Sequence, residues 1–401
     1  MQTNEVTSVE QPRKKRISKI LLTAVITAVI SVFMSFIIFY LIFIGDAKYL
    51  KLKQLDFFVN NYFYGEIDTN KINDLIVRGY VSGLEDRFAR YYNAEETEAR
   101  NKDLSGKGQG IGMIVVKHPD SENIFVKNVY DNSPAYLAGI REGDQIVSVD
   151  SVSVEEIGYA QAVNAILREV GQDMTLGILR NGETVNVKAT CTEFSAQTVF
   201  AKMLQNRYGY VQITAFNGET ALQFKNSVNQ LVSNGAEALI FDLRGNGGGT
   251  VDSVCEVLDF ICPKGDIITV KYANGKTEVL AESDKEEINL PMVVLTNEQT
   301  ASAAELFTAS VKDFGKGISI GGKTFGKGVM QTTYNFTDGS SVVFTVAEFF
   351  PNSGNSFNTL GISPDIEVAL SEKELKYQQI TPTEKDKVVL SAIEYLTKNE
   401  Q

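Results

Sequence analysis

The chain has 401 residues, 50 of them acidic and 38 basic, with one histidine, three cysteines and no tryptophan. This length allows two or three domains with hydrophobic cores, and the net charge of −12 argues against a nucleic-acid partner. Zinc sites use several histidines or cysteines, so the single His118 argues against a metal site, and we expect neither a metal ion nor a cofactor. A Ser-His-Asp triad would have to use His118, which lies in KHPDSEN, a sequence typical of a turn.

The N-terminal region is predicted to anchor the chain in a membrane. Five basic residues between positions 13 and 19 precede an uncharged run over residues 20–45. A helix of about 20 apolar residues spans a bilayer, and this run is too long for the core of a cleavable signal peptide. Because the basic residues lie on the N-terminal side, we expect residues 1–19 to stay in the cytoplasm. The prediction is a single-pass cell-membrane protein whose main body is extracytoplasmic.

The remaining chain divides into four regions by sequence texture. Residues 46–107 are predicted to be a mostly helical lead-in that ends in a polar joint. In residues 108–191, short apolar runs alternate with turns around one helical segment, which indicates a small β-rich domain. Strands alternate with helices in residues 192–370, the pattern of an α/β layer fold, and residues 371–401 end in an amphipathic helix.

The β-rich region begins with a glycine-flanked loop, Gly110-Ile111-Gly112. Successive backbone N–H groups of such a loop can bind an anion. The sequence SPAYLAGIREGDQIVSVD, residues 133–150, follows the next strands. Together they resemble a PDZ domain of the bacterial protease type, although each glycine could serve a tight turn alone. The resemblance implies that the loop captures a peptide carboxylate and that the peptide adds as a strand beside the one that follows. The candidate peptide-binding residues are Gly110, Ile111, Gly112 and Met113.

Arg168 ends the helical segment of this region. A solvated charge is the plain interpretation, and contact with the following domain is the alternative.

Three segments of the α/β region carry candidate chemistry. ALIFDLRGNGGGT places a glycine loop between a strand and a helix, where backbone N–H groups suit a developing anion. Ser302 lies at a predicted helix start with Glu305 three residues later, which is a capping box and also a place where a nucleophile would benefit from the helix dipole. Lys327 lies in GKTFGKGVMQ, where a solvated lysine is the alternative interpretation.

GISIGGKT, residues 317–324, matches the phosphate-binding pattern G-x-x-x-x-G-K-[ST] and would make the chain a nucleotide-dependent enzyme. That loop must open directly into a helix. Here ISI is itself predicted as a strand, and the residues after Thr324 predict another strand. We therefore expect no nucleotide site; magnesium-dependent ATP binding lost in Lys323→Ala would support one.

Side by side, the three segments resemble the carboxy-terminal processing, or tail-specific, serine peptidases. The family patterns D-L-R-x-N-x-G-G, N-x-x-x-A-S-A-x-E and T-F-G-K-G-x-x-Q correspond to residues 242–249, 297–305 and 324–331. Gly247 stands where proline is usual. The resemblance implies a multidomain α+β fold: a transmembrane helix, a helical lead-in, a PDZ domain and a crotonase-like (ClpP-like) α/β peptidase core. It also implies a homodimer, and peptide or protein substrates recognised by their C-terminal tails.

The resemblance also assigns roles in an acyl-transfer reaction. Ser302 is the implied nucleophile, Lys327 the general base and Gln331 the residue that orients the lysine, with oxyanion donors at the Ala303 N–H and at either Gly247 or Gly248. The expected activity is cleavage of extracytoplasmic proteins near their C-termini; a non-catalytic PDZ scaffold with a degenerate peptidase domain is the alternative.

Lysine is a base only when neutral, so Lys327 needs a lowered pKa, which burial supplies. Residues 318–336 contain no acidic side chain, which fits an apolar, uncharged setting; whether Glu305 or Glu348 comes close to Lys327 in space stays open. In a straight strand Lys327 and Gln331 would lie about 13 Å apart, so contact between them requires a bend.

Overall fold

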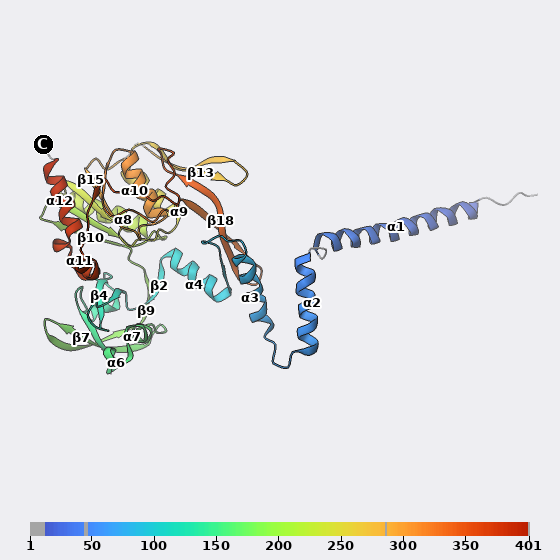
Figure 1. Cartoon of the computed structure of the whole chain (residues 1–401), viewed down its shortest axis with the longest axis horizontal. Coiled ribbons are helices and arrows are strands. Elements are labelled where there is room, and N and C mark those ends of the chain that lie inside the picture. Colours follow the sequence, from blue (N-terminus) through green and yellow to red (C-terminus); the bar gives the residue numbers. More distant parts are fainter. Residues whose placement is uncertain (1–12, 44–46, 285–286, 400–401) are drawn as a thin grey trace, which may run out of the picture. The chain divides into compact units, whose positions relative to one another are not determined.

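The computed structural model describes residues 13–43, 47–284 and 287–399 (Figure 1). The chain divides into two compact units after Asn73. The first unit contains α1 (Arg13–Phe43), α2 (Ala47–Tyr62) and the start of α3 (Thr69–Ser82). By length and composition, α1 contains one segment able to cross a membrane, Leu21–Tyr40. Residues 1–12 of the predicted tail and 44–46 around the predicted end of the anchor lie outside the described residues.

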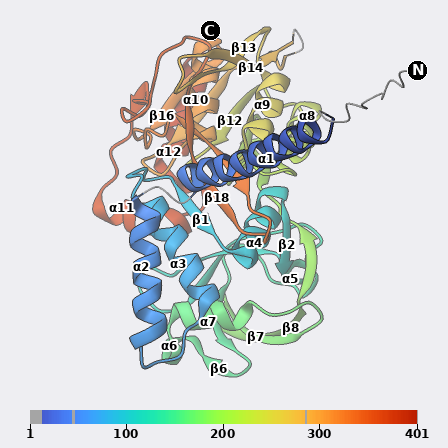
Figure 2. The same ribbon diagram turned by 90° about the vertical axis from the view of Figure 1, so that its right-hand side faces the viewer.

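The second unit opens with α3, β1 (Arg90–Tyr92) and α4 (Ala94–Ser105). The predicted polar joint is mostly helix α4, because Asn93 and Glu96 form a capping box at its start and Gly106, at φ 77°, ends it. Strand β1 was not expected in a helical lead-in. It pairs antiparallel with β18 (Ser341–Phe350), so the lead-in adds a strand to a distant sheet (Figure 2).

The β-rich module is built on a sheet of order β3-β4-β5-β7-β8, with β6 beside β5. Side chains along β4 alternate between the apolar core of the module and its surface, and Ile124 and Val126 are fully buried in that core. A two-stranded ribbon of β2 (Lys107–Gly110) and β9 (Thr192–Ser195) carries the chain into and out of the module (Figure 1). Its elements are β3 (Met113–Lys117), β4 (Ile124–Val129), α5 (Pro134–Leu137), β5 (Gln145–Val149), β6 (Val152–Ser153), α6 (Val154–Ile157), α7 (Tyr159–Ile166), β7 (Asp173–Arg180) and β8 (Glu183–Thr190).

The α/β core is a six-stranded sheet of order β10-β11-β12-β15-β16-β19. Only β10 runs antiparallel; the other strands pair in parallel. Strand β12 is buried throughout, because Leu239 and Phe241 pack with helices α8 to α10 while Ile240 packs with α12 on the other face. The bounds are β10 (Val199–Leu204), β11 (Tyr208–Ile213), α8 (Thr220–Ser233), β12 (Ala238–Asp242), α9 (Val251–Ile261), β15 (Met292–Thr296), α10 (Ala303–Asp313), β16 (Gly317–Gly321), β19 (Ile366–Glu367) and α12 (Lys387–Lys398).

A second sheet follows the order β1-β18-β13-β14, with β17 also paired to β18. Its further strands are β13 (Gly265–Tyr272), β14 (Thr277–Ser283) and β17 (Val329–Asn335). Since β16 occupies the middle of the phosphate-loop pattern and the chain then enters β17 rather than a helix, a phosphate cradle does not form there. The expected combination of a β-rich module and an α/β layered core is confirmed.

The C-terminal region contains α11 (Glu372–Tyr377) and two short 3₁₀ turns, Gln378–Ile380 and Thr383–Lys385, before α12. Lys376 and Tyr377 both bond to the carboxylate of Asp120, in the β3–β4 turn, at 2.6 Å. This segment therefore contacts the β-rich module as well as the core.

Candidate functional site

The three predicted catalytic segments follow neighbouring parallel strands: the glycine loop follows β12, the serine turn follows β15, and the lysine segment follows β16. Carboxyl ends of parallel strands meet at one edge of a sheet, so this topology brings the three segments together. The loop and the turn are joined directly. The Gly245 N–H donates to Asn297 Oδ1 at 3.0 Å, and the Ala301 N–H donates to the Asn246 carbonyl at 2.9 Å.

Ser302 lies at the start of α10 in a conformation that is unusual for a residue with a side chain, φ 57° and ψ −117°. Such a backbone costs about 1–3 kcal/mol and persists only where surrounding contacts enforce it. Its N–H donates to Glu305 Oε2 at 2.9 Å. The half-buried serine is thus held in a sharp turn between a buried strand and a buried helix.

Glu305 is a fully buried carboxylate that ties the serine turn to the lysine segment. Besides the Ser302 N–H, it accepts hydrogen bonds from Thr324 Oγ1 at 2.6 Å, the Gly326 N–H at 2.7 Å and the Lys327 N–H at 2.8 Å. The capping box predicted Glu305 at the helix start but gave no sign of these three distant partners. A buried anion with four donors is a strong constraint on both segments.

Lys327 is half-buried, and its Nζ lies 4.6 Å from the centroid of the Phe88 ring. Burial lowers the pKa of Lys327; the nearby Asp86 and Glu305 carboxylates act in the opposite direction and Arg87 adds to the lowering. The expected uncharged setting is wrong in this respect, because two carboxylates from other segments, Asp86 of the lead-in and Glu305 of α10, act on the amine. Among the described residues, the Lys327 amine forms no ion pair and no hydrogen bond with Ser302.

Gln331 lies on β17 beside a bulge at Met330. Its side-chain amide donates to the Val329 carbonyl at 3.1 Å and to Thr345 Oγ1 at 3.3 Å. In this arrangement its bonds go to the second sheet, and none reaches Lys327 among the described contacts.

The structure distinguishes the two glycines of the candidate oxyanion site. The Gly248 N–H donates to Asn246 Oδ1 at 2.8 Å, so it is already used within the loop. Within the described part of the chain, the N–H groups of Gly247 and Ala303 donate to no protein acceptor. Gly248 instead lets the glycine loop pack closely against the serine turn, since a Cβ there would lie 2.9 Å from Ser302 Cβ and 3.0 Å from the Ala303 nitrogen.

A buried ion network lies at the end of β12, where the glycine loop begins. Arg244 bonds to Asp242 at 2.6 Å and to Asp386, at the start of α12, at 2.9 Å. Tyr210 donates to the same Asp242 at 2.7 Å. Although burial alone would raise it, the pKa of Asp242 is lowered because Arg244 and Tyr210 stabilise its charge. The strand end that carries the loop is therefore fixed by charge-assisted hydrogen bonds.

The predicted peptide-binding loop of the β-rich module leads directly into β3. In the described sheet, β3 is an edge strand that pairs only with β4, so its other edge is open for an added strand. Gly112 has φ 75°, and a Cβ there would lie 2.4 Å from Ser133 Cβ, so glycine is required. The N–H groups of Ile111 and Gly112 donate to no acceptor among the described residues, while Gly110 ends β2.

Arg168 makes its hydrogen bonds inside the β-rich module. It donates to the carbonyls of Ala165 at 2.9 Å and Asp173 at 2.7 Å, and it pairs with the Asp150 carboxylate. Contacts from the module to the core are made elsewhere: the Asp131 N–H donates to Gln197 Oε1 at 2.7 Å.

Comparisons with known proteins agree with this architecture. Residues 207–368 match peptidase family S41, and residues 102–179 match the PDZ domain. The carboxy-terminal processing protease CtpA of Bacillus subtilis is 32% identical over 330 residues, which cover 82% of this chain and 70% of that protein. A CtpA-like serine protease of Staphylococcus aureus is 31% identical over 356 residues, 88% of this chain and 71% of that protein.

A solved S41 protease structure from Bacteroides fragilis has the same fold, with a TM-score of 0.60 at 17% identity, covering 84% of this chain and 93% of that one. The chain therefore belongs to the S41 serine peptidases, in the group of PDZ-containing carboxy-terminal processing proteases.

Proposed function

We propose that this protein is a membrane-anchored endopeptidase that cleaves extracytoplasmic proteins near their C-termini with a Ser302–Lys327 dyad. The observation that carries this proposal is the Glu305 carboxylate, which accepts the backbone N–H groups of both Ser302 and Lys327 at 2.9 and 2.8 Å. Nucleophile and base thus share one buried anchor at one edge of the sheet. A serine in a strained turn beside a glycine loop is also the arrangement that acyl transfer requires.

The reaction has two halves. Acylation forms an ester to Ser302 and breaks the peptide bond, and deacylation by water breaks that ester and releases the acid. Ser302 Oγ attacks the substrate carbonyl while neutral Lys327 Nζ takes the hydroxyl proton, and the lysine then returns this proton to the leaving amine. Water repeats the sequence on the acyl-enzyme and restores the serine. The N–H groups of Ala303 and Gly247, which have no protein acceptor in the described part of the chain, would donate to the oxyanion.

A local rearrangement of Lys327 completes the dyad. Its Nζ lies over the Phe88 ring rather than on Ser302. Lysine has four side-chain torsions, so the amine can move to the serine while its backbone N–H stays on Glu305. Gln331, the residue proposed to orient the lysine, would then exchange its contact with Thr345 for one with the amine.

The PDZ domain is proposed to hold the substrate tail. The open edge of β3 and the N–H groups of Ile111 and Gly112 suit an extended peptide with a free carboxylate. Gly110 and Met113 flank this loop. Arg168 is not part of this proposal, because its hydrogen bonds stay inside the module. This placement would set cleavage close to the C-terminus of the bound chain.

The anchor and its orientation are proposed from the apolar segment Leu21–Tyr40 together with the basic residues that precede it. The boundaries proposed for the remaining regions are 46–107 for the lead-in, 108–191 for the PDZ domain and 192–370 for the core.

A homodimer is also proposed, and sedimentation equilibrium of the full chain in detergent would test it: a monomer at micromolar concentration contradicts the dimer.

The central test is peptide hydrolysis by the full chain in detergent micelles. An unfolded extracytoplasmic protein is incubated with the enzyme, and mass spectrometry identifies the trimmed ends. Ser302→Ala and Lys327→Ala should abolish cleavage. Lys323→Ala is the matched control, since Lys323 is an exposed lysine of the same segment, and it should retain activity. Undiminished cleavage by Ser302→Ala would refute the proposed nucleophile.

Tail recognition needs a separate comparison. Two peptides of one sequence, one ending in a free carboxylate and the other in an amide, are offered as competing substrates. The free acid should have the higher kcat/KM, because an amide cannot be bound as an anion by the Ile111–Gly112 N–H groups. Equal values would leave the peptidase assignment intact and remove carboxylate capture by the PDZ domain.

A further inference from the structure

The turn formed by residues 84–88, between α3 and β1, lies against the lysine segment. Its anchor is Asp86, whose Oδ2 accepts the Thr345 N–H at 2.8 Å and whose Oδ1 accepts the Phe88 N–H at 2.9 Å. Burial raises the pKa of Asp86, but these N–H groups outweigh burial and hold that pKa below its usual value. The turn is therefore fixed to β18 by a charged residue, and this fixes the position of Phe88.

The Phe88 ring is in contact with the Lys327 amine. Nζ lies 4.6 Å from the ring centroid, well within the roughly 6 Å over which an aromatic face attracts a cation. The Arg87 guanidinium lies 4.6 Å from the same centroid. Within the described residues, the Lys327 amine has no hydrogen-bond acceptor and no ion-pair partner. Its direct contact is the ring face, while Asp86, Glu305 and Arg87 act on it from beyond ion-pair distance.

We propose that Phe88 is a positioning residue for Lys327: in the substrate-free enzyme its ring holds the amine charged and away from Ser302, and catalysis requires the amine to leave the ring. This inference rests on the proposed role of Lys327 as general base. It adds to that role a residue of the lead-in, outside the three segments that carry the catalytic pattern.

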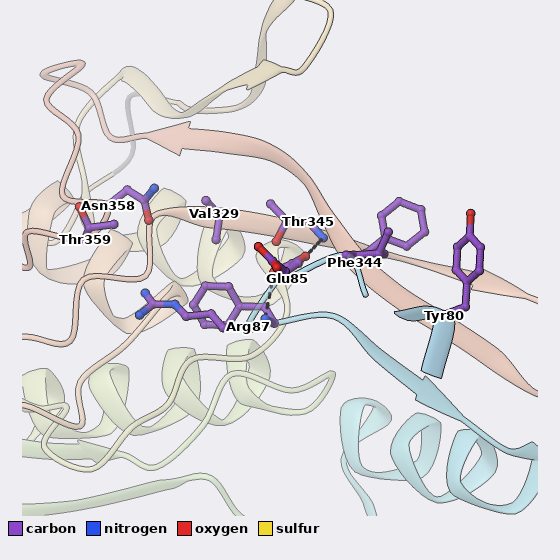
Figure 3. Close-up of a pocket in the computed structure, with 11 residues that line it drawn as sticks. Tyr80, Glu85, Arg87, Val329, Phe344, Thr345, Asn358 and Thr359 are labelled. Carbon is purple, nitrogen blue, oxygen red and sulfur yellow. Dashed lines mark hydrogen bonds between the residues drawn. The ribbon is translucent and has the colours of Figure 1, made fainter. Parts of the chain in front are cut away.

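An open cavity of about 700 Å³ lies beside Phe88, between the lead-in and the core strands (Figure 3). Part of the ring's surroundings is therefore open space rather than packed side chains, so a smaller side chain at position 88 does not leave a closed cavity in a core. The cavity is lined by Tyr80, Leu84, Glu85, Asp86, Arg87, Phe88, Val329, Phe344, Thr345, Asn358 and Thr359.

A ring face stabilises the ammonium form and offers little to the neutral amine. Replacing Phe88 by leucine keeps an apolar neighbour and removes the π face, so the charged form of Lys327 loses stability. The other charges that face the amine are Asp86 and Glu305, which favour its charged form, and Arg87, which opposes it; all three remain. The amine should then become neutral at a lower pH.

The test uses the full chain in detergent and a fluorophosphonate probe, which needs no knowledge of the natural substrate. Ser302 Oγ bonds to phosphorus, fluoride leaves, and the hydroxyl proton passes to Lys327. The second-order labelling rate against pH reports the ionisation of the free enzyme. Phe88→Leu should move the midpoint of this profile down by about one pH unit, an estimate from the usual strength of the contact.

Two controls separate this effect from general loosening. Phe88→Tyr keeps the ring and should keep the wild-type midpoint. Phe344→Leu removes an aromatic wall of the same cavity that stacks on Tyr334 at 5.0 Å, and it should also keep that midpoint. If Phe88→Leu does not fold, Phe88→Met tests the same point.

An unchanged midpoint in folded Phe88→Leu or Phe88→Met, with Ser302 labelled normally, would overturn the positioning role alone. Absence of labelling in the wild-type chain would instead refute the proposed dyad.

Discussion

Glu305 accepts the Lys327 N–H at 2.8 Å, so the residue that caps the helix of the proposed nucleophile, Ser302, also fixes the backbone of the proposed base. Its other oxygen binds Thr324 Oγ1 and the Gly326 N–H, at 2.6 and 2.7 Å. A single buried anion therefore sets the spacing of two segments that lie on different strand ends. This relationship makes Glu305 a structural link between the two residues of the proposed dyad.

Glu305→Gln tests this link. The neutral amide accepts hydrogen bonds less strongly, and its NH₂ group would face N–H donors, so the lysine segment should shift. A displacement of about 1 Å in a catalytic group costs about 100-fold in kcat. Glu298→Gln, which changes an exposed carboxylate of the same turn, is the matched control and should leave kcat unchanged. Steady-state peptide hydrolysis measures both, and equal rates for Glu305→Gln and wild type would contradict the link.

Gly248→Ala should inactivate the enzyme by displacing Ser302. The residue has φ 101°, and its new Cβ would lie 2.9 Å from both the Ala301 carbonyl oxygen and Ser302 Cβ. At Gly247 a Cβ would meet nothing within 4 Å, so Gly247→Ala keeps the backbone and its N–H in place. The loss in kcat/KM should therefore be much larger at position 248 than at 247. The opposite order in a kinetic comparison would mean that Gly248 is not the close-packing residue.

The pH profile follows from the ionisation of Lys327. Burial lowers its pKa, while Asp86 and Glu305 raise it. In the proposed mechanism the neutral Lys327 amine is the active form, so kcat/KM should increase with pH and level off above the pKa of Lys327 in the free enzyme. Asp86→Asn removes one anion and should shift this rise to lower pH. Profiles measured between pH 5 and pH 10 decide the matter; a rise that moves to higher pH in the variant would contradict the assignment.

Arg244→Met tests the ion network under the glycine loop. It leaves Asp242 and Asp386, which are 2% and 6% exposed, without their cation. Breaking a buried pair in this way costs about 3–5 kcal/mol of unfolding free energy. Lys102→Ala removes only an exposed pair with Glu98 and should leave the urea midpoint unchanged. Urea unfolding followed by circular dichroism compares the two variants, and equal midpoints would show that the network adds no stability.

The convergence of the catalytic segments could be predicted from the sequence, because each motif follows an apolar strand and parallel strands end at one edge. The choice between Gly247 and Gly248 could not, since it depends on the Asn246 side chain that occupies the Gly248 N–H. Local patterns show which residues can donate but not which donors are already used.

The setting of Lys327 was also beyond sequence reasoning. Its own segment lacks acidic residues, but Asp86 and Phe88 come from the lead-in, far away along the chain. The same non-local pairing explains β1: Arg90–Tyr92 lies in a region with a helical pattern and becomes a strand only because β18 offers an edge.

The most direct measurement is peptide mapping of the chain after reaction with a fluorophosphonate. A Ser302–Lys327 dyad should give one modified residue, Ser302, with labelling lost in Lys327→Ala and kept in Lys323→Ala. Labelling of a different serine, or undiminished labelling of Ser302 in Lys327→Ala, would contradict it.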